Sequence, residues 1–160
     1  MLKVVLDVNI YISSVFWELG NPHKIVEKAL DKKIQVFTSL EILQDVAKVM
    51  RRDFNEPKEM ITRQISLILA YTYVITPKDV GNVVKDDPDD DMILRCAAGS
   101  NADYIVSGDK HLLKLKTFKR AKIITAKELL NTSEIATRTL HPSDRGKRAI
   151  SERAQEHAPP

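Results

Sequence analysis

The chain has 160 residues, 43% of them hydrophobic, and its 25 Lys and Arg against 22 Asp and Glu give a formal net charge of +3. This composition predicts one soluble domain with its own core, and the single cysteine, Cys96, excludes an intrachain disulfide and a cysteine-based zinc site. No stretch is typical of a signal peptide or a membrane span, so we expect a cytoplasmic protein, and a net charge of +3 does not by itself indicate nucleic acid.

Strand and helix signals alternate from the first residues onward. A short apolar run at 3–6 is typical of a buried parallel strand, and a similar run follows at 34–37. Between the two runs, Asn21 and Pro22 are residues that often begin a helix, and apolar side chains follow at helical spacing. This part of the chain therefore predicts a strand, a helix and a second strand.

Two further helices and a strand are expected next. Ser39 can cap a helix whose apolar stripe is Leu40, Leu43, Val46, Val49 and Met50. Asn55 and Pro57 are expected to open another helix, with apolar positions at Met60, Ile61, Ile65, Ile68 and Leu69. A strand at 73–76 ends before Pro77.

The remaining elements repeat the alternation. A helix is expected at 88–98, strands at 103–107 and 122–125, and a closing helix at 126–130. The alternation favours an α/β fold in which a mainly parallel sheet carries helices on both faces. Residues 131–160 have no aromatic side chain and are expected to form a polar, mobile tail, so the folded domain is predicted to span 1–130.

Acidic residues follow two of the expected strands. Asp7 comes directly after the first strand, and Asp109 follows the strand at 103–107 through Gly108. Ligands of parallel α/β sheets bind outside the carboxyl ends of the strands, so these two acids are candidates for a functional site. The alternative is that each one only caps the turn that follows.

Further acids belong to the expected helices. Asp45 lies at the edge of the buried stripe of its helix, with Glu41 one turn earlier, although a solvated helix face explains both equally well. Five carboxylates stand between positions 86 and 91, more than helix capping requires. Asp91, next to apolar residues, is the member of this run expected to point inward.

Asp7, Asp45, Asp91 and Asp109 are predicted to converge at one edge of the sheet. A cluster of carboxylates without His or Cys suits Mg²⁺ or Mn²⁺ and disfavours zinc. Phosphodiester hydrolysis is the chemistry that such sites support. The sequence has neither a Walker phosphate loop nor the Gly-x-Ser-x-Gly motif of acyl-transfer serines, which argues against those two reaction classes.

Basic residues surround Asp109. Lys110, Lys114 and Lys116 open a run of cations without an acid, and a basic rim beside a metal site would hold a phosphate backbone. Arg51 and Arg52 either extend this rim or complement the negative end of their own helix. A solvated surface is the alternative for the lysines.

Four segments in this order resemble the PIN-domain family, in particular the VapC-like toxins of toxin–antitoxin systems. They are the residues at 4–10, 39–52, 87–91 and 104–110, and the resemblance covers roughly positions 2–130. It implies a three-layer α/β/α sandwich and a ribonuclease that depends on Mg²⁺ or Mn²⁺. It also implies a homodimer, and a cognate antitoxin that holds the enzyme inactive.

The same resemblance assigns roles to individual residues. Asp7, Asp91 and Asp109 match the metal-binding aspartates of the family, while Asn9 and Ser107 match polar residues that support the site. Asp45 stands where the family usually has Glu, and because Asp is one methylene shorter, its carboxylate would reach a metal through water. Glu41 is the fallback for this role.

Two alternatives to a ribonuclease stay open on the sequence alone. The presence of Asp45 in place of Glu is compatible with a PIN-like module that binds RNA or a partner protein with little or no catalysis. An acidic pocket that accepts a phosphoryl group on Asp7 is the other alternative.

Overall fold

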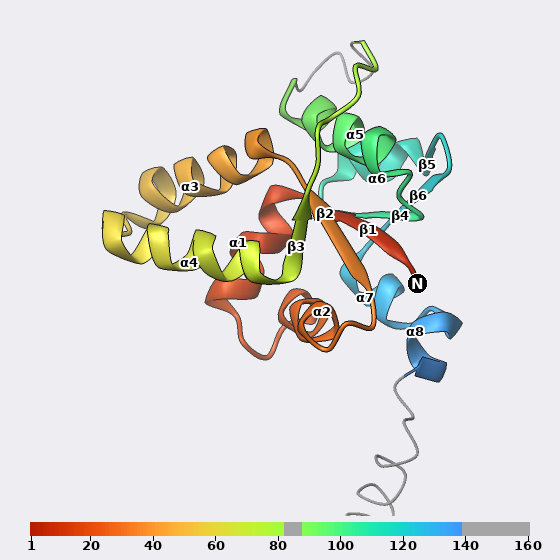
Figure 1. Cartoon of the computed structure of the whole chain (residues 1–160), viewed down its shortest axis with the longest axis horizontal. Coiled ribbons are helices and arrows are strands. Elements are labelled where there is room, and N and C mark those ends of the chain that lie inside the picture. Colours follow the sequence, from red (N-terminus) through yellow and green to blue (C-terminus); the bar gives the residue numbers. More distant parts are fainter. Residues whose placement is uncertain (82–87, 139–160) are drawn as a thin grey trace, which may run out of the picture.

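The structure of the chain, a computed structural model, describes residues 1–81 and 88–138. Six strands form one sheet in the order β3-β2-β1-β4-β6-β5 (Figure 1). Neighbouring strands are parallel except β5, which pairs antiparallel with β6. The predicted α/β fold with a mainly parallel sheet is therefore confirmed. The strands are β1 (Lys3–Leu6), β2 (Gln35–Thr38), β3 (Thr72–Val74), β4 (Tyr104–Val106), β5 (Thr117–Phe118) and β6 (Ala121–Ile124).

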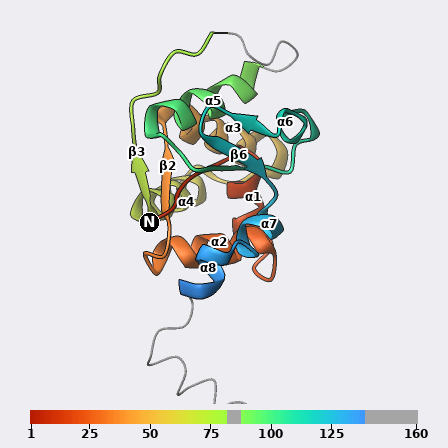
Figure 2. The same ribbon diagram turned by 90° about the vertical axis from the view of Figure 1, so that its right-hand side faces the viewer.

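Helices cover both faces of the sheet. One face carries α5, which contacts β1, β2 and β4, and the other carries α1, α2 and α7 (Figure 2). Helices α3 and α4 pack against each other, α3 also contacts α1 and α4 contacts α2, and the pair extends to one side of the sheet (Figure 1). The helices are α1 (Val8–Phe16), α2 (Asn21–Leu30), α3 (Leu40–Phe54), α4 (Lys58–Tyr71), α5 (Pro88–Ser100), α6 (Lys110–Leu115), α7 (Ala126–Leu130) and α8 (Ser133–Arg138).

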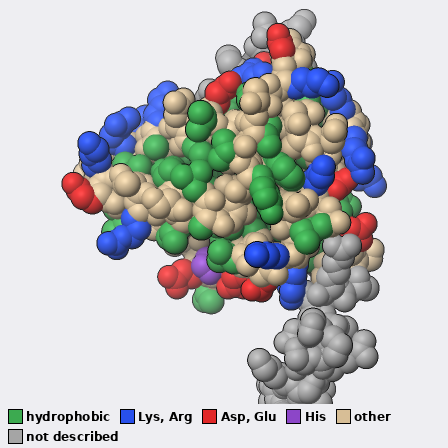
Figure 3. All heavy atoms as spheres, viewed as in Figure 1, with side chains coloured by type: hydrophobic (Ala, Val, Ile, Leu, Met, Phe, Trp, Pro, Cys, Tyr) green, Lys and Arg blue, Asp and Glu red, His purple; other side chains and the backbone are tan. Residues whose placement is uncertain are grey.

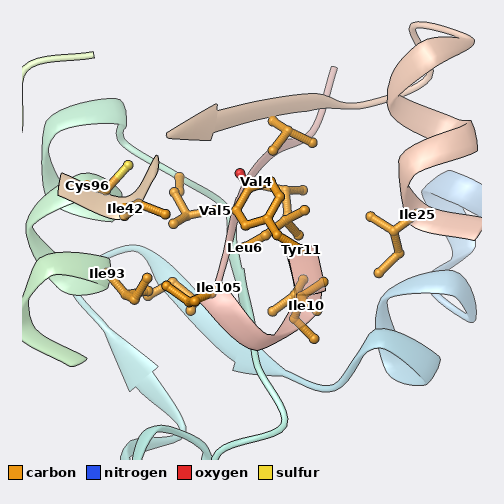
Figure 4. Packing of buried hydrophobic residues seen from close by; sticks show 14 of the residues in the cluster. Val4, Val5, Leu6, Ile10, Tyr11, Ile25, Ile42, Ile93, Cys96 and Ile105 are labelled. Carbon is orange, nitrogen blue, oxygen red and sulfur yellow. The ribbon is translucent and has the colours of Figure 1, made fainter. Parts of the chain in front are cut away.

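The core lies on both sides of β1. Val4, Val5 and Leu6 are fully buried, as the continuous apolar run predicts for a central parallel strand. Figure 4 shows Ile93 and Cys96 of α5 on one side of this strand, and residues of α1 and α2 on the other. Because a central strand is covered on both faces, it gives the residue that follows it a fixed position.

Three local features differ from the sequence-based expectations. The residues after Asp7 form α1, where a loop was expected, because Asp7 caps the helix and the next residues bury apolar side chains. Asn55 ends α3 in the left-handed region (φ 51°) and does not open α4, whose cap is Pro57. Leu40 was expected in the core but is 66% exposed, and Ile42 takes the buried position.

Gly99 fixes α5 against the segment that follows β3. A Cβ atom at position 99 would lie 2.7 Å from the carbonyl oxygen of Thr76. The same segment donates a backbone hydrogen bond from Lys78 to the Arg95 carbonyl, at 3.1 Å. Close packing through a glycine therefore sets the position of α5, the helix that carries Asp91.

The described part of the chain continues past residue 130. Helix α8 lies within the segment 131–160, and Ile135 on it is buried in the core cluster. Residues 139–160 of the expected tail lie outside the described residues. Among the described residues, no helix is both long and apolar enough to cross a membrane.

Candidate functional site

The order in which strands are added to the sheet reverses between the neighbouring strands β1 and β4. From β1, the following strands β2 and β3 lie on one side, whereas β4, β6 and β5 lie on the other. The crevice between two such strands, at their carboxyl ends, is where open α/β sheets bind ligands. Asp7 follows β1 and Asp109 follows β4 at this point, so the two acids that follow strands lie beside the crevice.

Ser107 joins the two strand ends. The Ser107 hydroxyl donates a hydrogen bond to Asp7 Oδ2 at 2.6 Å, and Ser107 Oγ accepts one from the backbone N–H of Asp109 at 2.9 Å. Asp7 and Ser107 are both buried, with exposed fractions of 7% and 0%. Burying a carboxylate is costly unless it is hydrogen-bonded, and Ser107 supplies one of the bonds that offset this cost.

Both acids also cap helices. Asp7 Oδ1 accepts the N–H of Val8 at 2.7 Å at the start of α1, and Asp109 Oδ1 accepts the N–H of His111 at 2.8 Å at the start of α6. Both acids therefore have the capping role that the sequence offered as an alternative, and this role uses one oxygen of each carboxylate. Each carboxylate has a second oxygen, and that of Asp7 bonds to Ser107. Asn9, in the first turn of α1, is exposed.

Asp91 reaches the same edge of the sheet from α5. The carboxyl end of α5 leads into the amino end of β4, so the helix runs antiparallel to the strand and its first turn lies toward the carboxyl edge. Asp91 is in that first turn and is 3% exposed. A buried carboxylate at this end of α5 matches the inward orientation expected from the sequence.

Glu41 and Asp45 have different surroundings on α3. Glu41 forms an ion pair with Arg95 of α5, with 2.7 Å between Oε2 and the guanidinium Nη2. Asp45, one turn further along α3, is partly buried. Glu41, the fallback for the helix acid, is thus bonded to a cation in this structure.

Asp91 belongs to a run of five acids between positions 86 and 91. Side chains at 86, 87, 89 and 90 lie outside the described residues. Among the side chains that the structure does describe, no three from His, Cys, Asp and Glu gather closely enough to hold a metal ion. The structure thus brings Asp7 and Asp109 together through Ser107 and directs Asp91 to the same edge of the sheet.

The basic residues fall into two separate groups. Lys110 and Lys114 are exposed on α6, and Lys116 is exposed directly after it, next to Asp109. Arg51 and Arg52 lie in the last turn of α3, which runs away from α5 and α6 (Figure 1). Arg52 also bonds to the neighbouring Asp53 at 2.7 Å. The position of the two arginines fits the helix-end interpretation better than a shared rim with the lysines.

Sequence reasoning missed two features near the site. Arg95 showed no pattern that would link it to Glu41, because the pair joins residues 54 positions apart. Behind β1, the hydroxyls of Tyr11 and Thr38 are buried without a hydrogen-bond partner among the described residues. Burial raises the pKa of the Tyr11 hydroxyl well above its ordinary value, and the nearby Tyr71 raises it further.

Comparisons with known proteins agree with this fold. Residues 3–111 match a family model described as PIN domain. An uncharacterized protein of Methanocaldococcus jannaschii is 29% identical over 119 residues, which cover 72% of this chain and 76% of that protein.

Two solved structures share the fold at low identity. One is the crystal structure of VapBC2 from Rickettsia felis bound to a DNA fragment from the VapBC2 promoter. A chain of it superposes with a TM-score of 0.57 at 15% identity, covering 76% of this chain and 97% of that chain. A Pyrobaculum aerophilum protein gives a TM-score of 0.54 at 13% identity, covering 81% of this chain and 87% of that chain.

Proposed function

This chain belongs to the PIN-domain family, and on that premise we propose that it is a metal-dependent endoribonuclease that hydrolyses phosphodiester bonds of single-stranded RNA. The observation that carries the proposal is the pair Asp7 and Asp109, joined through Ser107 at the crevice between β1 and β4. The exposed lysines of α6 stand next to this pair and supply positive charge for a phosphate backbone.

The chemistry of the donor set fits Mg²⁺ or Mn²⁺. Asp7, Asp91 and Asp109 offer carboxylate oxygens at one edge of the sheet, and these are the ligands that hard divalent cations prefer. We assign these three residues to the metal, and its binding would have to draw their carboxylates closer together than they stand in this structure. When bound, it would activate a water molecule and stabilise the charge that develops on the leaving oxygen.

The side chains of this protein then divide the other tasks. Ser107 orients Asp7 through its hydrogen bond to Oδ2, and the Asp109 N–H in turn orients Ser107. Asp45 acts on the attacking water as general base, or takes part in a second metal site. Lys110, Lys114 and Lys116 bind phosphates of the substrate on either side of the scissile bond, and Asn9 supports the site from the first turn of α1.

We further propose that the protein is the toxin of a toxin–antitoxin pair in the cytoplasm, and that it forms a homodimer. The structural likeness to a chain of VapBC2 supports the first part of this proposal. Exposed apolar side chains of α4 and β3 support the second.

The activity is tested with purified protein, Mn²⁺ and a mixed pool of single-stranded RNA. We expect cleavage by the wild-type chain and its loss in Asp7→Asn, because the amide cannot supply the same anionic ligand. Asp53→Asn, which changes an exposed acid paired with Arg52 at the far end of α3, is the matched control and should cleave normally. Equal cleavage by wild type and Asp7→Asn would show that the site is assigned wrongly.

The second candidate is a PIN-like module that binds RNA or a partner protein without catalysis. The observation in its favour is that Asp45 replaces the usual Glu while Glu41, the nearest longer acid, is paired with Arg95. Thermal unfolding with and without Mn²⁺ separates the two candidates. Stabilisation that is lost in Asp91→Asn supports the ribonuclease, whereas no response to Mn²⁺ together with retained RNA binding supports the module.

A further inference from the structure

A hollow of about 510 Å³ lies between α2 and α7, remote from the helices that surround the candidate active site. In both ribbon views α2, α7 and α8 gather on one side of the molecule, while α5 and α6 lie on the opposite side (Figures 1 and 2). The proposed ribonuclease activity assigns no task to any residue of this hollow.

Two helices present facing polar stripes to the hollow. Asn21, Lys24 and Lys28 recur at helical spacing on α2, and Lys127 and Asn131 are one turn apart at α7. Leu130 and Ile135 form the apolar part of the wall. Three lysines and two asparagines are therefore among the residues that line one hollow, beside a non-polar surface.

The charge around the hollow is unbalanced. Glu27 is the one acid among the lining residues, and it lies 3.4 Å from the imidazole of His23. Within residues 1–81 and 88–138, none of the three lysines forms an ion pair with a carboxylate. Burial lowers the pKa of Lys28 and the nearby Lys33 lowers it further, whereas the Asp31 and Glu27 carboxylates raise it.

Like charges one turn apart on a helix, such as those of Lys24 and Lys28, destabilise it. A bound anion reverses this effect, because each ammonium then gains a charge-assisted hydrogen bond. Phosphate groups are the anions that accept several such bonds at once. The hollow also falls within the usual range of ligand pockets, about 300–1,000 Å³, so it can hold more than the phosphate alone.

We propose that the hollow between α2 and α7 binds a phosphate-bearing ligand of about nucleotide size, with Lys24, Lys28 and Lys127 as its cationic contacts. Asn21 and Asn131 donate further hydrogen bonds from its rim, and Leu130 with Ile135 packs against the non-polar part of the ligand. The phosphate belongs either to a free nucleotide or to an RNA backbone that extends across the molecule from the active site.

Calorimetric titration of the full chain with pyrophosphate and with adenosine 5′-monophosphate, at low salt and in EDTA, tests the proposal. EDTA removes divalent cations, so binding at the acidic site does not contribute. We expect saturable binding, weakened at least about tenfold in Lys28→Gln/Lys127→Gln, since two charge-assisted hydrogen bonds are lost. Lys48→Gln/Lys78→Gln removes the same charge from exposed positions elsewhere and should bind as the wild type does.

Each outcome decides the proposal or the source of the phosphate. Absence of saturable binding, or equal weakening in both double variants, overturns the proposal. If a short single-stranded RNA displaces pyrophosphate, the source is a nucleic-acid backbone, and if only the mononucleotide binds, it is a free nucleotide. Because RNA cleavage is measured separately through Asp7→Asn, failure of the pocket and failure of the ribonuclease assignment are distinguishable.

Discussion

Ser107 holds the two halves of the candidate site together with a single hydroxyl. It donates to the carboxylate after β1 and accepts from the backbone after β4, so one oxygen sets the relation between Asp7 and Asp109. A residue in this position affects both stability and the geometry of the acids. Its role can therefore be tested without any assumption about the substrate.

Ser107→Ala is predicted to lower the free energy of unfolding by about 1–3 kcal/mol, because the buried Asp7 carboxylate loses one of its hydrogen bonds. Urea unfolding measures this change. Ser66→Ala is the control, since the hydroxyl of Ser66 bonds to a backbone carbonyl on an exposed face of α4 and its loss should be nearly neutral. Equal stability of Ser107→Ala and wild type would contradict the network.

Three buried ionisable groups predict how stability depends on pH. Burial raises the pKa of Cys96 from 9.0 to about 12, and burial also raises the pKa of Tyr11 and of Tyr71 above the ordinary 10.0. In the unfolded chain these groups ionise near their ordinary values, whereas in the folded chain they stay neutral. Their contribution to stability is therefore complete below about pH 9 and is lost as the pH rises above it.

Unfolding in urea at a series of pH values between 8 and 11 measures this loss. Each group that ionises only after unfolding adds a slope of about 1.4 kcal/mol per pH unit. Cys96→Ala removes one of the three groups, so its stability should fall less steeply than that of the wild type above pH 9. Parallel slopes for the two proteins would show that Cys96 ionises equally in both states.

At the scale of elements, the ion pair between Glu41 and Arg95 links α3 to α5. Glu41 lies one turn before Asp45, and Arg95 lies one turn after Asp91, so the pair ties together the two helices that carry these acids. The pair is partly exposed, with side-chain fractions of 47% and 27%. Its contribution to stability is therefore expected to be modest, about 0.2–1 kcal/mol.

A double-mutant cycle with Glu41→Gln and Arg95→Gln is predicted to give a coupling energy in that range. The exchange Glu41→Arg/Arg95→Glu is expected to restore part of the stability that the ion pair contributes. The exposed pair of Asp103 and Arg120, between β4 and the β5–β6 hairpin, provides a matched comparison. If Glu41 is also the fallback ligand for a metal, Arg95→Gln should strengthen stabilisation by Mn²⁺. An unchanged response to Mn²⁺ in Arg95→Gln would remove Glu41 from the candidate site.

Most helices and strands could be predicted from the sequence, and the exceptions have physical reasons. The apolar run at 3–6 predicted a buried parallel strand and the β-favouring residues at 103–107 predicted another, and these strands are β1 and β4. Asp7 and Asp109 were therefore expected to follow two strands, and the structure has them there. Helix α1 was missed because Asp7 fits a turn as well as a cap, and only the packing of the following residues decides between them. Asn55 was misassigned for a related reason: asparagine is favourable both at a helix start and in the left-handed conformation that ends one.

The site was less accessible to sequence reasoning than the fold. Acids at strand ends could be found because topology brings those ends together, whereas Ser107 was expected only through the resemblance to the PIN-domain family. The ion pair of Glu41 with Arg95 and the hollow between α2 and α7 depend on how distant helices pack, which periodicity within one helix does not reveal. Side-chain contacts across elements therefore had to come from the structure.

At the scale of the molecule, one face carries exposed apolar side chains. Figure 3 shows hydrophobic side chains gathered over the face where α4 and β3 lie. Leu67 and Leu69 of α4 are 54% and 47% exposed, and Tyr73 of β3 is 54% exposed. Apolar patches of this kind mark interaction surfaces in soluble proteins, so this face is where the proposed homodimer would form.

Leu67→Lys/Tyr73→Lys is predicted to convert a dimer into a folded monomer, since each lysine would place a charge in the interface. Light scattering at micromolar concentration gives the mass, and circular dichroism confirms that the variant is folded. Leu19→Lys, a substitution at a residue that is 94% exposed between α1 and α2, is the control and should leave the mass unchanged. A monomeric mass for the wild-type chain would already contradict the homodimer.

The hydrogen bond from Ser107 to Asp7 has a consequence for how the protein is made. It joins residues 100 positions apart, and β4, which carries Ser107, must insert beside β1 before the bond can form. During synthesis, Asp7 leaves the ribosome long before its partner exists, so a nascent chain has no assembled site throughout most of its translation. A ribonuclease built in this way would be inactive for most of the time that it is attached to the ribosome, which is itself rich in RNA.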